Sequence, residues 1–329
     1  MQWFFAGHAS ETLDAWLRSL GLPEGQQARL FDPGRRTTEP DGVRLLPGDD
    51  LVLALAPAHR LAIADVLGQS DRNPAYASPR SVRGDELEAA LRTAGSSPAM
   101  EELVRRVIYR HGRRLYLADV FAALNRLDSR AEKLRLVRLA SSSPACFVHF
   151  HVRPDDSPER LAAYWGKRGR RKDLVSLFES LRALPNGGHL DLGHLLPTFA
   201  RQRLYSYPHP ALLRDAVRRD CHWTTLNFFS YTPDDRFGVS EEAQCYILEH
   251  DYPVGETPQF GDLVFLWRPG GAVIHSRVYL AANLVFTKNG DTARQPWAVM
   301  DLDDVREIYS VLAPDGMTVR FWRNLDYEN

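Results

Sequence analysis

Apolar residues recur at three- and four-residue spacing through most of residues 10–140, interrupted by Pro, Gly and Ser. This period is typical of short amphipathic helices. Two examples are "SETLDAWLRSLGLP", with Ser10 as the expected N-cap, and "PAMEELVRRVIYRHG", expected to be helical up to Gly112. The pattern has no fixed repeat, and it predicts a mostly helical region over residues 1–145.

The period changes to two in "ACFVHFHVRP", which predicts a strand. One face of this strand carries Cys146, Val148, Phe150 and Val152. Because that face needs cover and a lone strand has no hydrogen-bond partner, we expect it to pair with "TVRFWR" near the C-terminus. A helix is expected to follow in "DLVSLFESLRALPNGG". Residues 146–204 are thus expected to pack on the C-terminal part.

Short strands with turn signals dominate the chain after about residue 205. They are "GDLVFLWRP", "AVIHSRVYL", "LVFTKNG" and "MTVRFWRNL", with one helix, "DLDDVREIYSVL", among them. A helix that begins near Asp220 precedes this series. A helix followed by an antiparallel meander predicts an α+β fold for residues 205–329, with the boundary in "YSYPHPALL".

Composition narrows the classes of function. Lys and Arg total 41 against 42 Asp and Glu, so we expect no specific nucleic-acid partner and no membrane partner. Cys146, Cys221 and Cys245 form no CxxC pair and are typical of reduced thiols. The N-terminus lacks a basic start and a cleavage site, and no apolar run reaches about 18 residues, so a cytoplasmic protein is expected.

Cys221 is the first candidate for chemistry. It stands in "RRDCHWTTLNFF", where a helix that begins near Asp220 would place it in the first turn. Unpaired backbone N–H groups and the helix dipole stabilise a thiolate at that position. The alternative is a thiol that only packs, since free Cys is among the most buried residue types. His222 is expected to point about 100° away along the helix, so the base must come from elsewhere.

His275 is the candidate base, and Asn289 is the residue expected to orient it. If residues 281–283 form a hairpin loop, the strand register places His275 opposite Asn289. Opposed side chains have Cβ atoms about 4.5–5.5 Å apart, which lets Asn accept from Nδ1–H and leaves Nε2 free. Asn283 suits a left-handed loop position. The alternatives are a half-buried structural His and an Asn that only forms a turn. With Cys221, the pattern predicts a Cys-His-Asn triad.

Three segments carry a resemblance to a known family: "RDCHWTTLNFF", "FGDLVFLW" and "VIHSRVYLAANLVFTKNG". In order and approximate spacing they resemble the NlpC-type papain-like cysteine peptidases, over about 110 residues, roughly 215–325. The resemblance implies a papain-like domain in which a nucleophile-bearing helix packs on an antiparallel sheet. It also implies Cys221 as nucleophile, His275 as general base and acid, and Asn289 as the orienting residue.

Other segments, "YWGKRGRRKDL", "HLLPTFARQRLY" and "QPWAVM", are similar to a group of bacterial proteins without an assigned activity. The chain departs from the cell-wall peptidases in two ways. It lacks the Tyr and Trp-Gly-Gly segment that usually precedes the cysteine, and it shows no secretion signal or wall-binding repeat. Both departures argue against peptidoglycan as the substrate.

These observations predict a cysteine peptidase or amidase that forms a thioester on Cys221, needs no cofactor and acts on a peptide or another amide. Two alternatives remain: an acyltransferase that passes the thioester to an amine, and a non-enzymatic interaction protein whose papain-like part is a relic. The basic run Lys167–Lys172 is expected to be a solvated turn rather than a phosphate site. His149 and His151 have no acidic or Cys ligand nearby in sequence, so no metal is expected. The oligomeric state stays open.

Overall fold

A computed structural model describes residues 1–77, 79–209, 211, 217–255, 257–292, 295–313 and 315–324. The chain divides into two compact units, Met1–Ser143 and Pro144–Asn329. Helix (43%) and strand (22%) are both abundant and the strands named below pair antiparallel, so the α+β class is confirmed. Within the described ranges, no helix is long and apolar enough to cross a membrane.

The first part of unit 1 is a three-stranded sheet with short helices. The strand order is β1-β3-β2. The strands are β1 (Trp3–Ala6), β2 (Arg36–Glu39) and β3 (Gly42–Leu45), and the helices are α1 (Ser10–Ser19), α2 (Glu24–Leu30), α3 (Asp49–Ala54), α4 (Pro57–Leu67) and α5 (Pro74–Ala77), with a 3₁₀ turn at Pro33–Arg35.

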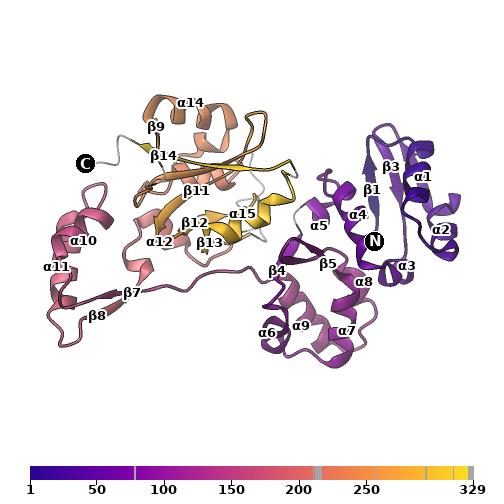
Figure 1. The fold of residues 1–329 in the computed structure, drawn as a ribbon, viewed down its shortest axis with the longest axis horizontal. Coiled ribbons are helices and arrows are strands. Elements are labelled where there is room, and N and C mark those ends of the chain that lie inside the picture. The colour runs from indigo at the N-terminus through magenta and orange to yellow at the C-terminus, as the bar shows by residue number, and fades with distance from the viewer. Residues whose placement is uncertain are drawn as a thin grey trace. The chain divides into compact units, whose positions relative to one another are not determined.

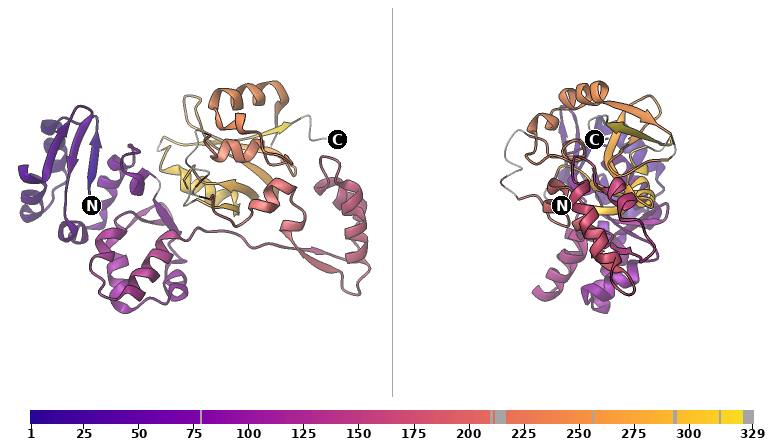
Figure 2. Two further views of the ribbon diagram at one scale, coloured as in Figure 1. Left: turned by 180° about the vertical axis from the view of Figure 1, so that it is seen from behind. Right: turned by 90° about the vertical axis from the view of Figure 1, so that its left-hand side faces the viewer.

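The second part of unit 1 has another three-stranded sheet, of order β4-β6-β5, and its own apolar cluster. Figure 1 shows its helices grouped beside the small sheet, and Figure 2 shows the same part from behind. The elements are β4 (Arg80–Arg83), α6 (Leu87–Ala94), α7 (Pro98–Val107), β5 (Ile108–His111), β6 (Arg114–Leu117), α8 (Val120–Leu124) and α9 (Arg130–Ser141).

Helix exceeds strand in the N-terminal region, as predicted, but the short strands β1 to β6 were not predicted. The helix expected to run to Gly112 ends at Val107, and the chain continues as β5, paired with β6. The residues at this change, Val107, Ile108 and Tyr109, are β-branched or aromatic and favour a pleated surface. Ser10 is the first helical residue of α1 and not its cap, because the N-cap position is Ala9.

Unit 2 begins with a two-stranded ribbon and two helices. Its elements are β7 (His149–Val152), α10 (Pro158–Trp165), α11 (Arg171–Arg182), β8 (Gly188–Asp191), a 3₁₀ turn at Leu192–His194 and α12 (Thr198–Arg203). The strand expected over 146–152 is thus shorter than predicted, and it pairs with β8, not with 318–323. The turn before β8 folds the chain back beside β7, which satisfies that strand's backbone locally. Cys146 N still donates to Val299 O at 2.7 Å, on the large sheet.

The large sheet of unit 2 has six antiparallel strands in the order β13-β12-β11-β10-β14-β9 (Figure 1). The strands are β9 (Asp251–Val254), β10 (Leu263–Trp267), β11 (Val273–Ala281), β12 (Leu284–Lys288), β13 (Trp297–Asp301) and β14 (Thr318–Asn324). The helices are α13 (Cys221–Leu226), α14 (Ser240–His250) and α15 (Leu302–Ser310), with a 3₁₀ turn at Asp235–Gly238. The expected boundary in residues 205–213 falls partly outside the described residues.

The two faces of this sheet carry different apolar clusters. One face packs on α13, and its strand residues are Leu263, Phe265, Val278, Leu280, Phe286, Trp297 and Val299. The other face packs on α15, and its strand residues are Val264, Leu266, Val285, Ala298 and Met300. The two sets alternate along β10, β12 and β13, because successive side chains of a strand point to opposite faces. The face on which a polar residue of these strands lies therefore follows from the apolar residues one and two positions away along the same strand.

Candidate functional site

Cys221 is the first residue of α13, as the sequence predicted. Asp220 is the N-cap, and its carboxylate accepts from the backbone N–H groups of His222 at 2.8 Å and Trp223 at 3.1 Å. A cap of this kind fixes where the helix begins. The Cys221 side chain is nearly buried, with 7% of the residue exposed.

The imidazole of His222 is held between α13 and β11. Its Nδ1 lies 2.9 Å from the Ser276 hydroxyl, which donates its own proton to Thr225 Oγ1 at 3.1 Å. A serine hydroxyl has one proton, so Ser276 accepts from His222 Nδ1–H. This bond leaves Nε2 of His222 available for another partner. Ser276 thus does for His222 what Asn289 was expected to do for His275.

The electrostatics of His222 connect it to Cys221. Burial alone would lower the pKa of the imidazole, but the neighbouring Cys221 and the charge of Asp220 raise it to about 9. The expectation that the base must come from elsewhere in the fold did not weigh this electrostatic interaction between neighbours in the chain. The imidazole beside the thiol is that of the next residue in the chain.

His275 lies on the other face of the sheet. Ser276 contacts α13, so the adjacent His275 points towards α15, where its ring stacks on Tyr309 with centroids 4.1 Å apart. Its Nε2 lies 2.9 Å from Thr287 Oγ1. Burial, then the charges of Arg277 and His222, hold the pKa of His275 well below its usual range. Among the described residues, the hydrogen-bond partner of this imidazole is Thr287 and its ring partner is Tyr309.

Asn289 does lie near His275, through one intervening hydroxyl. Thr287 donates to Asn289 Oδ1 at 3.1 Å and faces the imidazole of His275 on its other side. The register expected from the sequence holds in the strands, where Val278 pairs with Phe286. The loop is shorter than expected, because Ala281 already pairs with Leu284.

Two further polar residues, missed at the sequence level, share the α13 face with Cys221. One is Ser276. The other is Lys288, whose buried ammonium group donates to Gly290 O and lies 5.7 Å from the Trp297 ring. Burial lowers the pKa of Lys288 to about 8, against the charges of Asp291, Cys221 and Asp220, which raise it. Alternation along the strands groups both residues with Val278 and Phe286, but only the structure shows that this face packs on α13.

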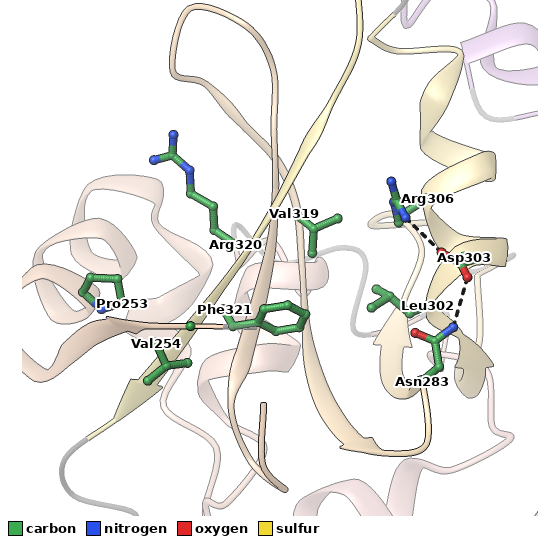
Figure 3. Close-up of a pocket in the computed structure, with 10 residues that line it drawn as sticks. Pro253, Val254, Asn283, Leu302, Asp303, Arg306, Val319, Arg320 and Phe321 are labelled. Atoms are coloured by element: carbon green, nitrogen blue, oxygen red, sulfur yellow. Dashed lines mark hydrogen bonds and ion pairs between the residues drawn. The ribbon is translucent and has the colours of Figure 1, made fainter. Parts of the chain in front are cut away.

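A groove of about 500 Å³ opens elsewhere in unit 2 and is shown in Figure 3. Asp303 holds the polar lining residues together: its carboxylate accepts from Asn283 Nδ2 at 3.2 Å and from Arg306 Nη1 at 3.0 Å. Its lining residues are Pro253, Val254, Gly255, Asn283, Leu302, Asp303, Arg306, Val319, Arg320 and Phe321. None of these lining residues is a Cys, Ser, Thr, His or Lys, and the one carboxylate, Asp303, is hydrogen-bonded to Asn283 and paired with Arg306.

The remaining candidates have local structural partners. His151 stacks on His189 with centroids 4.2 Å apart, and the described residues contain no group of three or more His, Cys, Asp or Glu side chains able to hold a metal. In the basic run, Arg170 donates to Leu195 O at 2.9 Å from both terminal nitrogens. Helix α11 begins one residue later, at Arg171. Residues 167–170 thus form the expected turn ahead of this helix, with Arg168 exposed and Arg170 half-buried.

The arrangement at Cys221 is that of a thiol with an adjacent, oriented imidazole and a buried cation on the same face of the sheet. Such groups can activate a sulfur nucleophile and return a proton to a leaving group. Comparison with known proteins adds no family to this description. No protein-family model matches the chain, and none of the curated proteins matches it.

Proposed function

We propose that the protein is a cysteine hydrolase, a peptidase or amidase, in which Cys221 is the nucleophile and His222 is its acid–base partner. One observation carries the proposal: next to Cys221 at the start of α13, the His222 imidazole is oriented by the Ser276 hydroxyl, 2.9 Å from its Nδ1. A functional pair of nucleophile and base needs a third group that orients the base. Ser276 supplies that group here.

The reaction follows from these positions. The Cys221 thiolate attacks the carbonyl carbon of an amide, and the carbonyl oxygen takes the electron pair. When the tetrahedral intermediate collapses, the carbon–nitrogen bond breaks and the His222 imidazolium gives its proton to the leaving amine. A thioester remains on Cys221. Neutral His222 then takes a proton from water as the water attacks the thioester, which releases the acid and restores the pair.

Lys288 has a supporting role in this proposal. Its ammonium group is buried on the same face of the sheet and interacts with the charge of Cys221. A positive charge in a site with little water stabilises a thiolate more strongly than it does in bulk water. Lys288 is thus a positioning and electrostatic residue, and the chemistry is assigned to Cys221 and His222.

An amine in place of water as the acceptor would make the same site an acyltransferase, and the first half-reaction would not change. The non-enzymatic alternative does not explain the arrangement around Cys221, because a cysteine that only packs needs no oriented imidazole beside it. Removing the hydrogen-bonded side chains of His222, Ser276 and Thr225 from water costs desolvation free energy. Beside an inert thiol, this cost would serve no catalytic role.

The experiment is an acylation burst with p-nitrophenyl acetate, a small activated ester. The full chain should release about one equivalent of nitrophenol quickly, and mass spectrometry should find the acetyl group on Cys221. Cys221→Ala should remove the burst, while the matched control Cys245→Ala should keep it. A chain that is acetylated equally at Cys221 and Cys245, or that shows no burst, would overturn the proposal.

A further inference from the structure

Two helices in unit 1 are joined by a tight turn of three residues. Helix α6 ends at Ala94, Gly95 adopts the left-handed conformation at φ 65°, and Ser97 caps α7 by accepting from Met100 N at 3.2 Å. Glycine meets no steric penalty in that conformation. A short turn that contains Gly also joins the two helices of the helix-turn-helix motif in DNA-binding proteins.

The strands around this pair complete a winged form of the motif. β4 precedes α6, and α7 leads directly into the hairpin of β5 and β6. β4 pairs with β6, giving the order β4-β6-β5. Both helices contribute to the local apolar cluster, with α8 and α9 closing it; the buried members are Leu87, Leu91, Met100, Val104, Val107, Leu115, Leu117, Ala123, Leu127, Leu136 and Leu139.

The outer surface of this part is basic. Residues 80–143 hold 13 Lys and Arg against 8 Asp and Glu, although the whole chain is nearly neutral. Helix α7 exposes Arg105 and Arg106, and the hairpin exposes Arg110 and, in its loop, Arg113. A local excess of arginine on a helix and the adjoining hairpin is the electrostatic footprint of a nucleic-acid surface.

The ion pairs of these arginines are weak enough to exchange. Arg105 lies 2.9 Å from Glu88 and Arg106 lies 3.0 Å from Glu102, and the paired side chains are 44–60% exposed. Exposed pairs of this kind contribute about 0–1 kcal/mol. A phosphate can therefore replace the carboxylate at little cost.

We propose that unit 1 binds double-stranded DNA, with α7 in the major groove and the β5–β6 hairpin against the phosphate backbone. The major groove is about 12 Å wide and accepts an α-helix. Arginines at the C-terminal half of α7 and on the hairpin would contact phosphates. At the N-terminal half of α7, the exposed Glu102 would meet base edges, where a carboxylate can accept from cytosine N4. Charge favours DNA over a protein partner for this surface. The proposal is independent of the chemistry at Cys221.

The test is fluorescence anisotropy of the full chain with a labelled duplex of about 20 base pairs, measured at several salt concentrations. The wild type should bind with an affinity that falls steeply with salt. The double change Arg110→Ala and Arg113→Ala should lower the slope of log K against log salt by about 2 and weaken binding at least tenfold. Arg106→Ala should lower the slope by about 1.

Arg29→Ala is the matched control, since Arg29 is an exposed arginine of unit 1 on α2 with only a 4.0 Å pair to Asp50. It should leave the affinity unchanged, and melting curves should show all variants folded. Three results would overturn the proposal: no binding at low salt, equal binding to single-stranded DNA of the same length, or duplex binding that the hairpin arginines do not affect. The last result would place the DNA on another surface of the chain.

Discussion

Ser276 connects strand β11 to the imidazole beside Cys221. Ser276→Ala removes the acceptor for His222 Nδ1–H and the donor to Thr225. We expect the acylation rate of Cys221 to fall about tenfold or more, because the base loses its orientation. The free energy of unfolding should fall by only about 1–2 kcal/mol. Ser310→Ala is the control, since it removes a serine hydroxyl from α15 that bonds only Glu307 O. Equal acylation rates in both variants would exclude a positioning role for Ser276.

His275 and His222 give opposite predictions. His275→Leu removes the bond to Thr287 and the stack on Tyr309, so it should lower the free energy of unfolding by about 1–3 kcal/mol. The acylation rate of the folded variant should stay within about twofold, whereas His222→Gln should lower it at least tenfold. A stable His275→Leu variant without acylation would instead support the triad of Cys221, His275 and Asn289.

At the residue scale, the sequence predicted the register between β11 and β12 correctly, but not which face of β11 packs on α13. Asn283 has φ 67°, as its place in the hairpin predicted, and Val278 pairs with Phe286 as expected. What the sequence could not determine is which face of β11 packs on α13. That choice depends on packing between α13 and the sheet, far apart in the chain, and it separates Ser276 from His275.

The contribution of His222, on helix α13, to the free energy of unfolding should depend on pH. The pKa of His222 is about 9 in the folded chain against 6.5 for an ordinary His. The folded chain therefore holds a proton that the unfolded chain releases between these values, so this contribution is fully present below about pH 6.5 and is lost as the pH rises through 9. Denaturant unfolding of the wild type and of His222→Gln should show a difference that shrinks by about 1–3 kcal/mol over that range. A difference that grows with pH would contradict the pairing with Cys221.

At the element scale, long periodic segments were predicted best. Helix α11 and the strands β10, β11, β12 and β14 lie where the patterns placed them. The N-terminal strands were missed because each has only four residues, too few to show a period of two. The predicted pairing of β7 with residues 318–323 was also wrong, because β7 pairs with β8. That pairing depends on the turn before β8, and the glycines of this turn allow several backbone geometries.

At the scale of the whole molecule, each unit has its own core and should unfold separately. Unit 1 contains a buried ion pair, in which Arg60 Nη1 lies 2.7 Å from Asp119 Oδ2 and both side chains are 1% exposed. Asp119→Asn leaves the Arg60 charge without a counter-charge and should destabilise unit 1 by about 3–5 kcal/mol. Calorimetry should show one transition lowered and the other unchanged, with normal acylation of Cys221.

Asp85→Asn is the control for this change, since Asp85 pairs with Arg83 at 3.2 Å on the surface and should contribute about 0–1 kcal/mol. A single transition that moves as one in Asp119→Asn would show that the two units unfold together. It would also mean that the separate cores do not make them independent.

The most direct test of the site is a competition among the three cysteines. Cys245 is exposed, Cys146 is half-buried and Cys221 is buried, so accessibility alone would rank Cys245 first for alkylation. With limiting iodoacetamide near pH 7, we predict that Cys221 reacts at least tenfold faster than Cys245, because a first-turn position in a helix and a neighbouring imidazole both favour the reactive form of a thiol. His222→Gln should remove this advantage. If Cys245 reacts first, and Cys221 reacts at the same rate in the wild type and in His222→Gln, then Cys221 is a packing residue and the enzymatic account is wrong.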